Sequence, residues 1–268
     1  MRSRFPFRSL IVLVSLPGIL ACSLFTTDGA STQNGIPIFA SPIKLILPGG
    51  LASSATADTI DVVTDQTGAP WDIAPAHLQL SLHGYPPNSS FHVPQIFVYP
   101  AQQYAAANQS AAESIKRLKA ILSKPDAQYQ NDDLPYVPFF NAGQVLAAQD
   151  KVINFKGGSG LRIVTQYAQD VSPINNGGLF YHFEGLTSDG RFYIVTILPT
   201  SLPYLAVDNN PDSPVPTGGI PFPRNTASAS SFENYFKGMT DLINTSPVDQ
   251  FDPSLNTLDA LIQSISTQ

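Results

Sequence analysis

Residues 161–199 constrain the fold more than any other part of the sequence. They contain three runs rich in β-branched and aromatic residues, which are typical of strands. These runs are Leu161–Tyr167, Leu179–Leu186 and Arg191–Leu198. The connection Ser188-Asp189-Gly190 favours a three-residue hairpin loop with the glycine in the left-handed conformation. Such a loop predicts that Phe183 pairs with Val195 and Tyr181 with Ile197.

Both faces of the predicted hairpin carry apolar side chains. One face is predicted to hold Leu179, Tyr181, Phe183, Tyr193, Val195 and Ile197. The other is predicted to hold His182, Glu184, Leu186, Phe192, Ile194 and Thr196. Because apolar side chains on both faces of a sheet have to be removed from water, we expect other elements to cover each side.

The rest of the chain supplies more strands and several amphipathic helices. Further strands are predicted at Ile43–Leu47, Thr59–Thr64, His77–His83, Gln95–Tyr99 and Lys151–Lys156. Helices are predicted at Tyr104–Leu122 and Ala142–Gln149, after a capping box at Ser230 and Glu233, and after Pro253. This order predicts one α+β domain, in which helices pack on an antiparallel sheet of about seven strands.

The N-terminus predicts export and a lipid anchor. Three arginines within the first eight residues precede the apolar run Leu10–Leu20, which is too short for an ordinary transmembrane helix. The run leads into Ala21-Cys22, and this pattern resembles the signal of bacterial lipoproteins, in which the cysteine is lipidated. We therefore expect residues 1–21 to be a signal peptide, Cys22 to carry the lipid, 22–41 to be a flexible tether, and 42–268 to be the domain. Plain secretion and a retained anchor are the alternatives.

The balance of charge excludes some partners. The formal net charge is −6, and removal of the three N-terminal arginines leaves 11 Lys and Arg against 20 Asp and Glu, or −9. An acidic chain without a basic cluster is poorly suited to nucleic acids or anionic lipid headgroups. Cys22 is the only cysteine, so the mature domain has no disulfide.

Four residues are candidates for acid–base chemistry. His182 and Glu184 lie two apart on one strand, where they form either a catalytic pair or a structural polar contact. His83 and His92 flank a proline-rich loop. The spacing of histidines and acidic residues matches no metal-binding pattern, and the sequence indicates no cofactor.

The segment Pro203–Ala229 is unusually long and rich in proline for a connection within a domain. It carries an apolar tip at Ile220-Pro221-Phe222. Binding residues are frequent on loops held by a rigid scaffold, so Ile220 and Phe222 are candidates for a contact with a partner or ligand. A surface loop without a function is the alternative.

Four stretches resemble an uncharacterised family of bacterial lipid-anchored or secreted proteins of unknown function. These stretches are Pro94–Pro100, Phe140–Val145, Gly158–Gln169 and Leu179–Tyr193. The order of elements also resembles the PsbP-like α/β/α sandwich, a group of non-catalytic binding and assembly proteins. The first resemblance implies a shared fold and an envelope location but no catalytic residues, and the second implies a fold only.

Two classes of function follow from these observations. The first is a non-catalytic binding or assembly module, held at the extracytoplasmic side of a bacterial membrane by a lipid on Cys22, with an envelope protein or a small ligand as its partner. The second is an extracytoplasmic hydrolase that uses His182 and Glu184, or His83 and His92. The sequence contains no complete catalytic constellation and therefore favours the first class.

Overall fold

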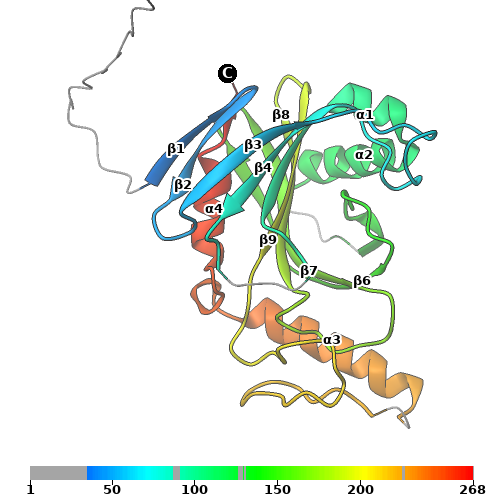
Figure 1. The fold of residues 1–268 in the computed structure, drawn as a ribbon. Helices are drawn as coiled ribbons and strands as arrows, with labels where there is room; N and C mark the ends of the chain where they lie inside the picture. Colours follow the sequence, from blue (N-terminus) through cyan, green and yellow to red (C-terminus); the bar gives the residue numbers. More distant parts are fainter. Residues whose placement is uncertain (1–34, 87–90, 126–128, 130, 225–226, 268) are drawn as a thin grey trace, which may run out of the picture. The chain divides into compact units, whose positions relative to one another are not determined.

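A seven-stranded antiparallel sheet forms the centre of the fold, with β8 (Phe180–Thr187) and β9 (Phe192–Pro199) in its interior (Figure 1). The computed structural model describes residues 35–86, 91–125, 129, 131–224 and 227–267. Within these residues the strand order is β3-β4-β5-β9-β8-β7-β6. The other strands of this sheet are β3 (Ser54–Ile60), β4 (His77–His83), β5 (Gln95–Pro100), β6 (Gly143–Phe155) and β7 (Gly158–Ala168). The predicted α+β domain with an antiparallel sheet of about seven strands is confirmed.

A smaller sheet and four helices complete the described part of the domain. The small sheet has the order β1-β2-β10 and consists of β1 (Gly35–Ala40), β2 (Ile43–Pro48) and β10 (Ser266–Thr267). The helices are α1 (Ala101–Ala107), α2 (Gln109–Ser123), α3 (Ala229–Thr245) and α4 (Leu255–Gln263). Two short 3₁₀ turns are η1 (Asn131–Asp133) and η2 (Val248–Gln250).

Both faces of the large sheet are covered, and this explains why its central strands are apolar on both sides. Every residue of β8 is buried. Helices α1 and α2 cover one face, where Tyr104, Ile115 and Leu118 join a core with Phe180. Helices α3 and α4 and the small sheet contribute to a second core on the other face (Figure 1). The prediction of a sheet covered on both sides is therefore confirmed.

The pairing of β8 with β9 differs from the predicted pairing by one residue. Phe183 lies opposite Thr196 rather than Val195, and Tyr181 lies opposite Leu198. The predicted set of side chains on each face of the hairpin is consequently wrong for β9. A shift of one residue exchanges the two faces of a strand, because successive side chains point to opposite sides.

The hairpin loop explains this shift. The side chain of Asp189 accepts hydrogen bonds from the backbone N–H of Arg191 and from the hydroxyl of Thr187, at 3.0 and 2.7 Å. These bonds hold Arg191 in the loop, which is therefore one residue longer than predicted. Gly190 has a φ of 69°, the left-handed conformation that the sequence predicted for it.

Residues predicted as the helix Ala142–Gln149 form a strand instead. Residues 143–149 belong to the long strand β6, which pairs with β7 with two irregularities in register and also contains the predicted strand Lys151–Lys156 as far as Phe155. The segment is rich in alanine and glutamine, which favour helices, but the pairing with β7 outweighs this weak local preference. The predicted strand Thr59–Thr64 is also misplaced, since β3 ends at Ile60.

The predicted helix Tyr104–Leu122 is divided into α1 and α2 at Asn108. The backbone of Asn108 is extended, with φ −138° and ψ 115°. Its side chain accepts hydrogen bonds from the N–H groups of Ser110 and Ala111 and thus caps α2. A polar residue that looked like part of a helical stripe therefore starts a new helix.

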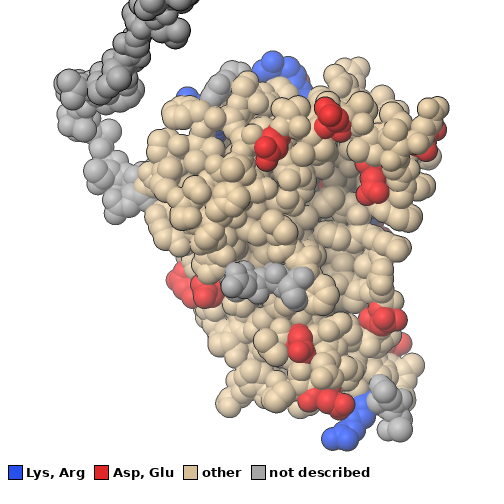
Figure 2. Space-filling model, viewed as in Figure 1, with Lys and Arg blue, Asp and Glu red and all other residues tan. Residues whose placement is uncertain are grey.

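The predicted signal peptide, residues 1–21, and Cys22 lie outside the described residues. Strand β1 begins at Gly35, so the last part of the predicted tether 22–41 belongs to the folded domain. Among the described residues, no helix is both long and apolar enough to cross a membrane. Figure 2 shows scattered acidic and basic side chains on one face of the molecule, and no basic cluster gathers there.

Candidate functional site

A pocket of about 390 Å³ lies at the end of the sheet where β7 ends and β8 begins. Because the strands are antiparallel, the start of β5, the start of β6, the end of β7 and the start of β8 all lie at this end. Segments that are far apart in the sequence therefore converge there. The lining residues are Phe91, His92, Phe140, Asn141, Ala142, Gln166, Tyr167, Ala168, Gln169, Asp170, Ser172, Asn175, Gly178 and Asn209.

Aromatic rings form one part of the lining. The ring of His92 lies 4.4 Å from that of Phe180 and 5.5 Å from that of Phe140, between ring centroids. The ring of Phe140 in turn lies 4.8 Å from that of Tyr167. These rings pack on one another and continue into the core beneath α1 and α2. The aromatic part of the pocket is thus held in place by the core.

Two buried amide side chains shape the connection between β7 and β8. The Nε2 group of Gln166 donates to the carbonyl oxygen of Pro173 at 3.1 Å, and its Oε1 accepts from the N–H of Asn175 at 2.9 Å. The Oδ1 atom of Asn175 accepts from the N–H of Gly178 at 2.9 Å. Because these bonds satisfy buried polar groups, they fix the backbone that leads into β8.

Exposed polar side chains lie at the mouth of the pocket. They are Asn141, Gln169, Asp170 and Asn209. The Nε2 group of Gln169 donates to the backbone carbonyl of Asn141 at 2.8 Å, which joins the end of β7 to the segment before β6. Within the described part of the chain, the side chains of Asn141, Asp170 and Asn209 form no hydrogen bond and no ion pair. Their polar atoms face solvent.

The electrostatic character of the lining is close to neutral. Burial lowers the pKa of His92 to about 4, with a smaller contribution from His182, while a hydrogen bond to the backbone of Gly178 opposes the shift. The imidazole is therefore uncharged at neutral pH. Burial raises the pKa of Tyr167, so its hydroxyl stays protonated. Among the described residues that line the pocket, none is Lys or Arg, and Asp170 is the acidic residue.

His182 and Glu184 form a buried pair under α2. The exposed fraction is 3% for His182 and 0% for Glu184. The Nδ1 atom of His182 donates to the carbonyl oxygen of Thr196 at 2.8 Å, and its Nε2 atom lies 2.9 Å from Oε1 of Glu184. Sequence reasoning left open whether this was a catalytic pair or a polar contact. The structure shows the two in direct contact but sealed from solvent.

Three further groups complete the surroundings of Glu184. Its carboxylate accepts hydrogen bonds from the N–H of Val137 at 2.8 Å, from the hydroxyl of Ser114 at 3.1 Å, and from the hydroxyl of Tyr193. Burial raises the pKa of Glu184, and His182 together with the hydrogen bonds from Val137 and Ser114 opposes the shift. Ser114 lies on α2 and is bonded to Glu184 rather than to His182. The arrangement therefore differs from a nucleophile held by a histidine base.

The two other candidate histidines lie apart from this pair. His92 lines the pocket and packs on the ring of Phe180, whose centroid lies 5.8 Å from that of His182. His83 is exposed at the end of β4, where its Nε2 lies 3.1 Å from the hydroxyl of Thr56. The structure therefore does not bring the four candidate residues into one pocket. Among the described residues, no group of His, Cys, Asp and Glu side chains is arranged to hold a metal ion.

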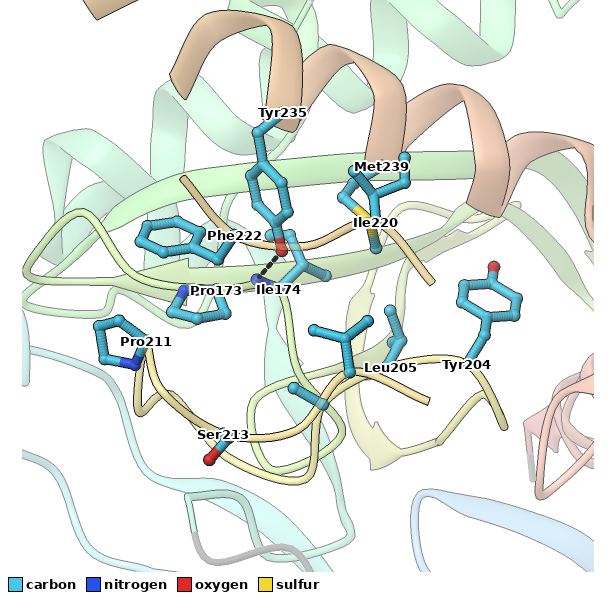
Figure 3. A pocket seen from close by; sticks show the side chains of 12 residues that line it. Pro173, Ile174, Tyr204, Leu205, Pro211, Ser213, Ile220, Phe222, Tyr235 and Met239 are labelled. Atoms are coloured by element: carbon cyan, nitrogen blue, oxygen red, sulfur yellow. Dashed lines mark hydrogen bonds between the residues drawn. The ribbon is translucent and has the colours of Figure 1, made fainter. Parts of the chain in front are cut away.

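Ile220 and Phe222, the predicted binding tip, lie against α3 (Figure 3). Both side chains are half-buried, and the ring of Phe222 packs edge-to-face on that of Tyr235 with centroids 5.0 Å apart. The hydroxyl of Tyr235 accepts a hydrogen bond from the N–H of Ile174 at 3.0 Å. The hollow between them has a volume of about 10 Å³, which is close to the space of one water molecule. In this structure the apolar tip attaches its own loop to α3.

The pocket itself was not predicted from the sequence. Phe140, Gln166 and Gln169 belong to stretches that were noted for a family resemblance, without a role in binding. One local signal was present, since a largely polar stretch that contains a proline, residues 169–176, directly follows an apolar strand. That signal does not reveal which other segments meet there, because their meeting depends on the order of the strands.

Comparison of the sequence with models of protein families and with curated proteins finds no match. The resemblances to the uncharacterised lipoprotein family and to the PsbP-like sandwich therefore stay predictions.

Proposed function

We propose that this chain is a non-catalytic binding module, anchored by a lipid on Cys22 at the extracytoplasmic side of a bacterial membrane, which takes a small ligand into the pocket at the end of β7. The observation that carries this proposal is a contrast between two sites. The pocket has aromatic walls, polar groups at its mouth and access to solvent. The pair of residues best suited to acid–base chemistry is closed off from solvent.

The size and lining of the pocket support ligand binding. A volume of about 390 Å³ falls within the range of roughly 300–1,000 Å³ that is usual for small-molecule sites. Such sites combine apolar walls with a few placed polar groups. The rings of Phe140 and Tyr167 and the side chains of Asn141 and Asp170 provide this combination.

The hydrolase alternative has less support. Catalysis by His182 and Glu184 would require a substrate to reach groups that are almost fully buried. Catalysis by His83 and His92 would require the two to share a site, whereas His92 lines the pocket and His83 does not. His92 alone, with a pKa of about 4, is a weak base near neutral pH.

A pocket-filling substitution tests the proposal. Ala142 lines the pocket, and Ala142→Trp places an indole ring in it. Ala106 is exposed on α1, so Ala106→Trp adds the same bulk elsewhere and serves as the matched control. The measurement is ligand-observed NMR of the full chain in detergent with a panel of small polar and aromatic fragments. We expect some fragments to bind the wild type and the control variant equally and not to bind Ala142→Trp. Identical fragment binding by all three proteins would mean that the pocket is not the ligand site.

A further inference from the structure

The chemistry of the lining indicates which class of ligand the pocket takes, provided that the proposed binding function is correct. We propose that it takes an uncharged, hydroxyl-rich ligand, such as one or two sugar rings. The first support is the abundance of amides in the lining. Five of the described lining residues are Asn or Gln: Asn141, Gln166, Gln169, Asn175 and Asn209.

Amide side chains suit hydroxyl groups because both donate and accept hydrogen bonds. Gln166 and Asn175 are buried and use their polar atoms within the protein, so they act as a support. Asn141, Gln169 and Asn209 are exposed at the mouth. The side chains of Asn141 and Asn209 have no hydrogen bond to another described residue, so their polar atoms are available to a ligand.

Aromatic rings supply the second element of a sugar site. A sugar ring has an apolar face of C–H groups that packs on an aromatic ring, while its hydroxyls point sideways. Phe91 lines the pocket with 56% of its surface exposed, and Phe140 and Tyr167 line it as half-buried rings. The protonated hydroxyl of Tyr167 adds a hydrogen-bond donor.

The charges of the lining argue against an anionic ligand. No Lys or Arg is among the described lining residues, and the imidazole of His92 is uncharged. A phosphate or carboxylate in this pocket would lose water without gaining a cationic partner, which is costly. Asp170 would in addition repel it.

A cationic ligand is the competing class, because aromatic rings and a carboxylate also suit a quaternary ammonium group. Among the described lining residues Asp170 is the only acidic one, and it lies exposed at the mouth. Screening by water weakens an exposed charge. The amides outnumber this one carboxylate, so the lining favours a neutral ligand.

The experiment compares three classes of small probe on the full chain in detergent. The neutral probes are the methyl glycosides of glucose, galactose, mannose and N-acetylglucosamine. Choline is the cationic probe, and glucose 6-phosphate is the anionic one. We expect saturation-transfer NMR to show contact with at least one neutral glycoside and none with glucose 6-phosphate. Ala142→Trp removes the signal, and Ala106→Trp keeps it.

Two substitutions separate the ligand classes. Asp170→Asn removes the charge but keeps a hydrogen-bond acceptor, so the dissociation constant of the glycoside changes by about two-fold or less, whereas binding of a cation is lost. Asn141→Ala removes one amide and weakens the glycoside about three- to ten-fold.

The outcomes distinguish the failure of this inference from the failure of the proposed function. Binding of choline that depends on Asp170, without binding of any glycoside, overturns the sugar class and leaves the pocket as a ligand site. Binding of glucose 6-phosphate to the pocket also overturns it. If no glycoside, no choline and no fragment gives a signal that Ala142→Trp removes, the proposed binding function fails as well.

Discussion

His92 and His182 are two mostly buried histidines with opposite surroundings. His92 lies among aromatic rings, and burial lowers its pKa to about 4. His182 lies between a backbone carbonyl and the carboxylate of Glu184. The residue type alone indicated acid–base chemistry for both, but the neighbours decide the role. One histidine is a neutral wall of a pocket, and the other is a link inside the core.

The lowered pKa of His92 predicts a loss of stability in acid. In the unfolded chain His92 has its ordinary pKa of about 6.5 and takes up a proton as the pH falls, while the folded protein resists protonation down to about 4. Protonation therefore stabilises the unfolded state relative to the folded state between these pH values, by as much as about 3 kcal/mol at pH 4. We expect His92→Gln to remove this part of the pH dependence.

Urea unfolding of the wild type and of His92→Gln at several pH values checks this prediction. The difference in unfolding free energy between the two proteins should be constant above pH 7 and should change in favour of the variant as the pH falls towards 4. A difference that does not vary with pH would show that His92 titrates normally in the folded protein.

At the scale of elements, a polar junction attaches α2 to the sheet. Ser114 comes from α2, Glu184 from β8, Tyr193 from β9, and Val137 from the connection before β6. Together with His182, three of these residues surround the carboxylate of Glu184, which has no exposed surface: the hydroxyls of Ser114 and Tyr193 and the N–H of Val137 donate to it, and His182 shares a proton with it. A network of this kind specifies how the helix sits, because each member is satisfied in one arrangement only.

Removal of the Glu184 carboxylate should destabilise the folded protein. Glu184→Ala leaves the Nε2 atom of His182 and the N–H of Val137 without their partner in the core, whereas the hydroxyl of Ser114 keeps its contacts with Tyr193 and Tyr136. We expect the unfolding free energy to fall by about 3–5 kcal/mol. Glu113→Ala is the control on the same helix: its carboxylate pairs with Lys116 and Arg117 near the surface, so we expect the unfolding free energy to fall far less than in Glu184→Ala. Equal denaturation midpoints for wild type and Glu184→Ala would mean that the junction contributes nothing.

The sequence predicted whether a segment is a helix or a strand where its pattern of apolar and polar side chains is strong. It did not predict which residues of neighbouring elements contact each other. The alternation in His77–His83 and in the 161–199 region identified strands β4, β7, β8 and β9. The pairing of Tyr181 with Leu198 was missed because it depends on the bonds of one loop side chain, Asp189. The helix predicted at Ala142–Gln149 was wrong because the neighbouring strand decided the conformation of a weakly biased segment.

At the scale of the whole molecule, the pocket is a product of strand order. Its lining comes from segments before β5, before β6, at the end of β7, before β8 and after β9. Each segment alone resembles an ordinary loop. The candidate pair His182 and Glu184 was identified because its members are two residues apart, whereas Phe91 and Asn209 become neighbours of one pocket only through the fold.

The proposed lipid anchor belongs to the same scale, because it concerns where the whole chain resides. Cys22→Ser should abolish incorporation of labelled fatty acid and shift the protein out of the detergent phase on phase separation. Ser23→Ala keeps the cysteine and should be labelled normally. Labelling of Cys22→Ser at the level of the wild type would show that the anchor lies elsewhere.

The pairing of β5 with β9 also has a consequence in time. It joins residue 95 to residue 197, so the centre of the sheet cannot form until most of the chain has been synthesised. Pairings between distant segments slow folding, because a long loop must close before any contact rewards it. The proposed route to the envelope takes the chain through a membrane before it folds. We expect the distance in sequence between β5 and β9, which are neighbours in the sheet, to help keep the chain unfolded during that proposed passage.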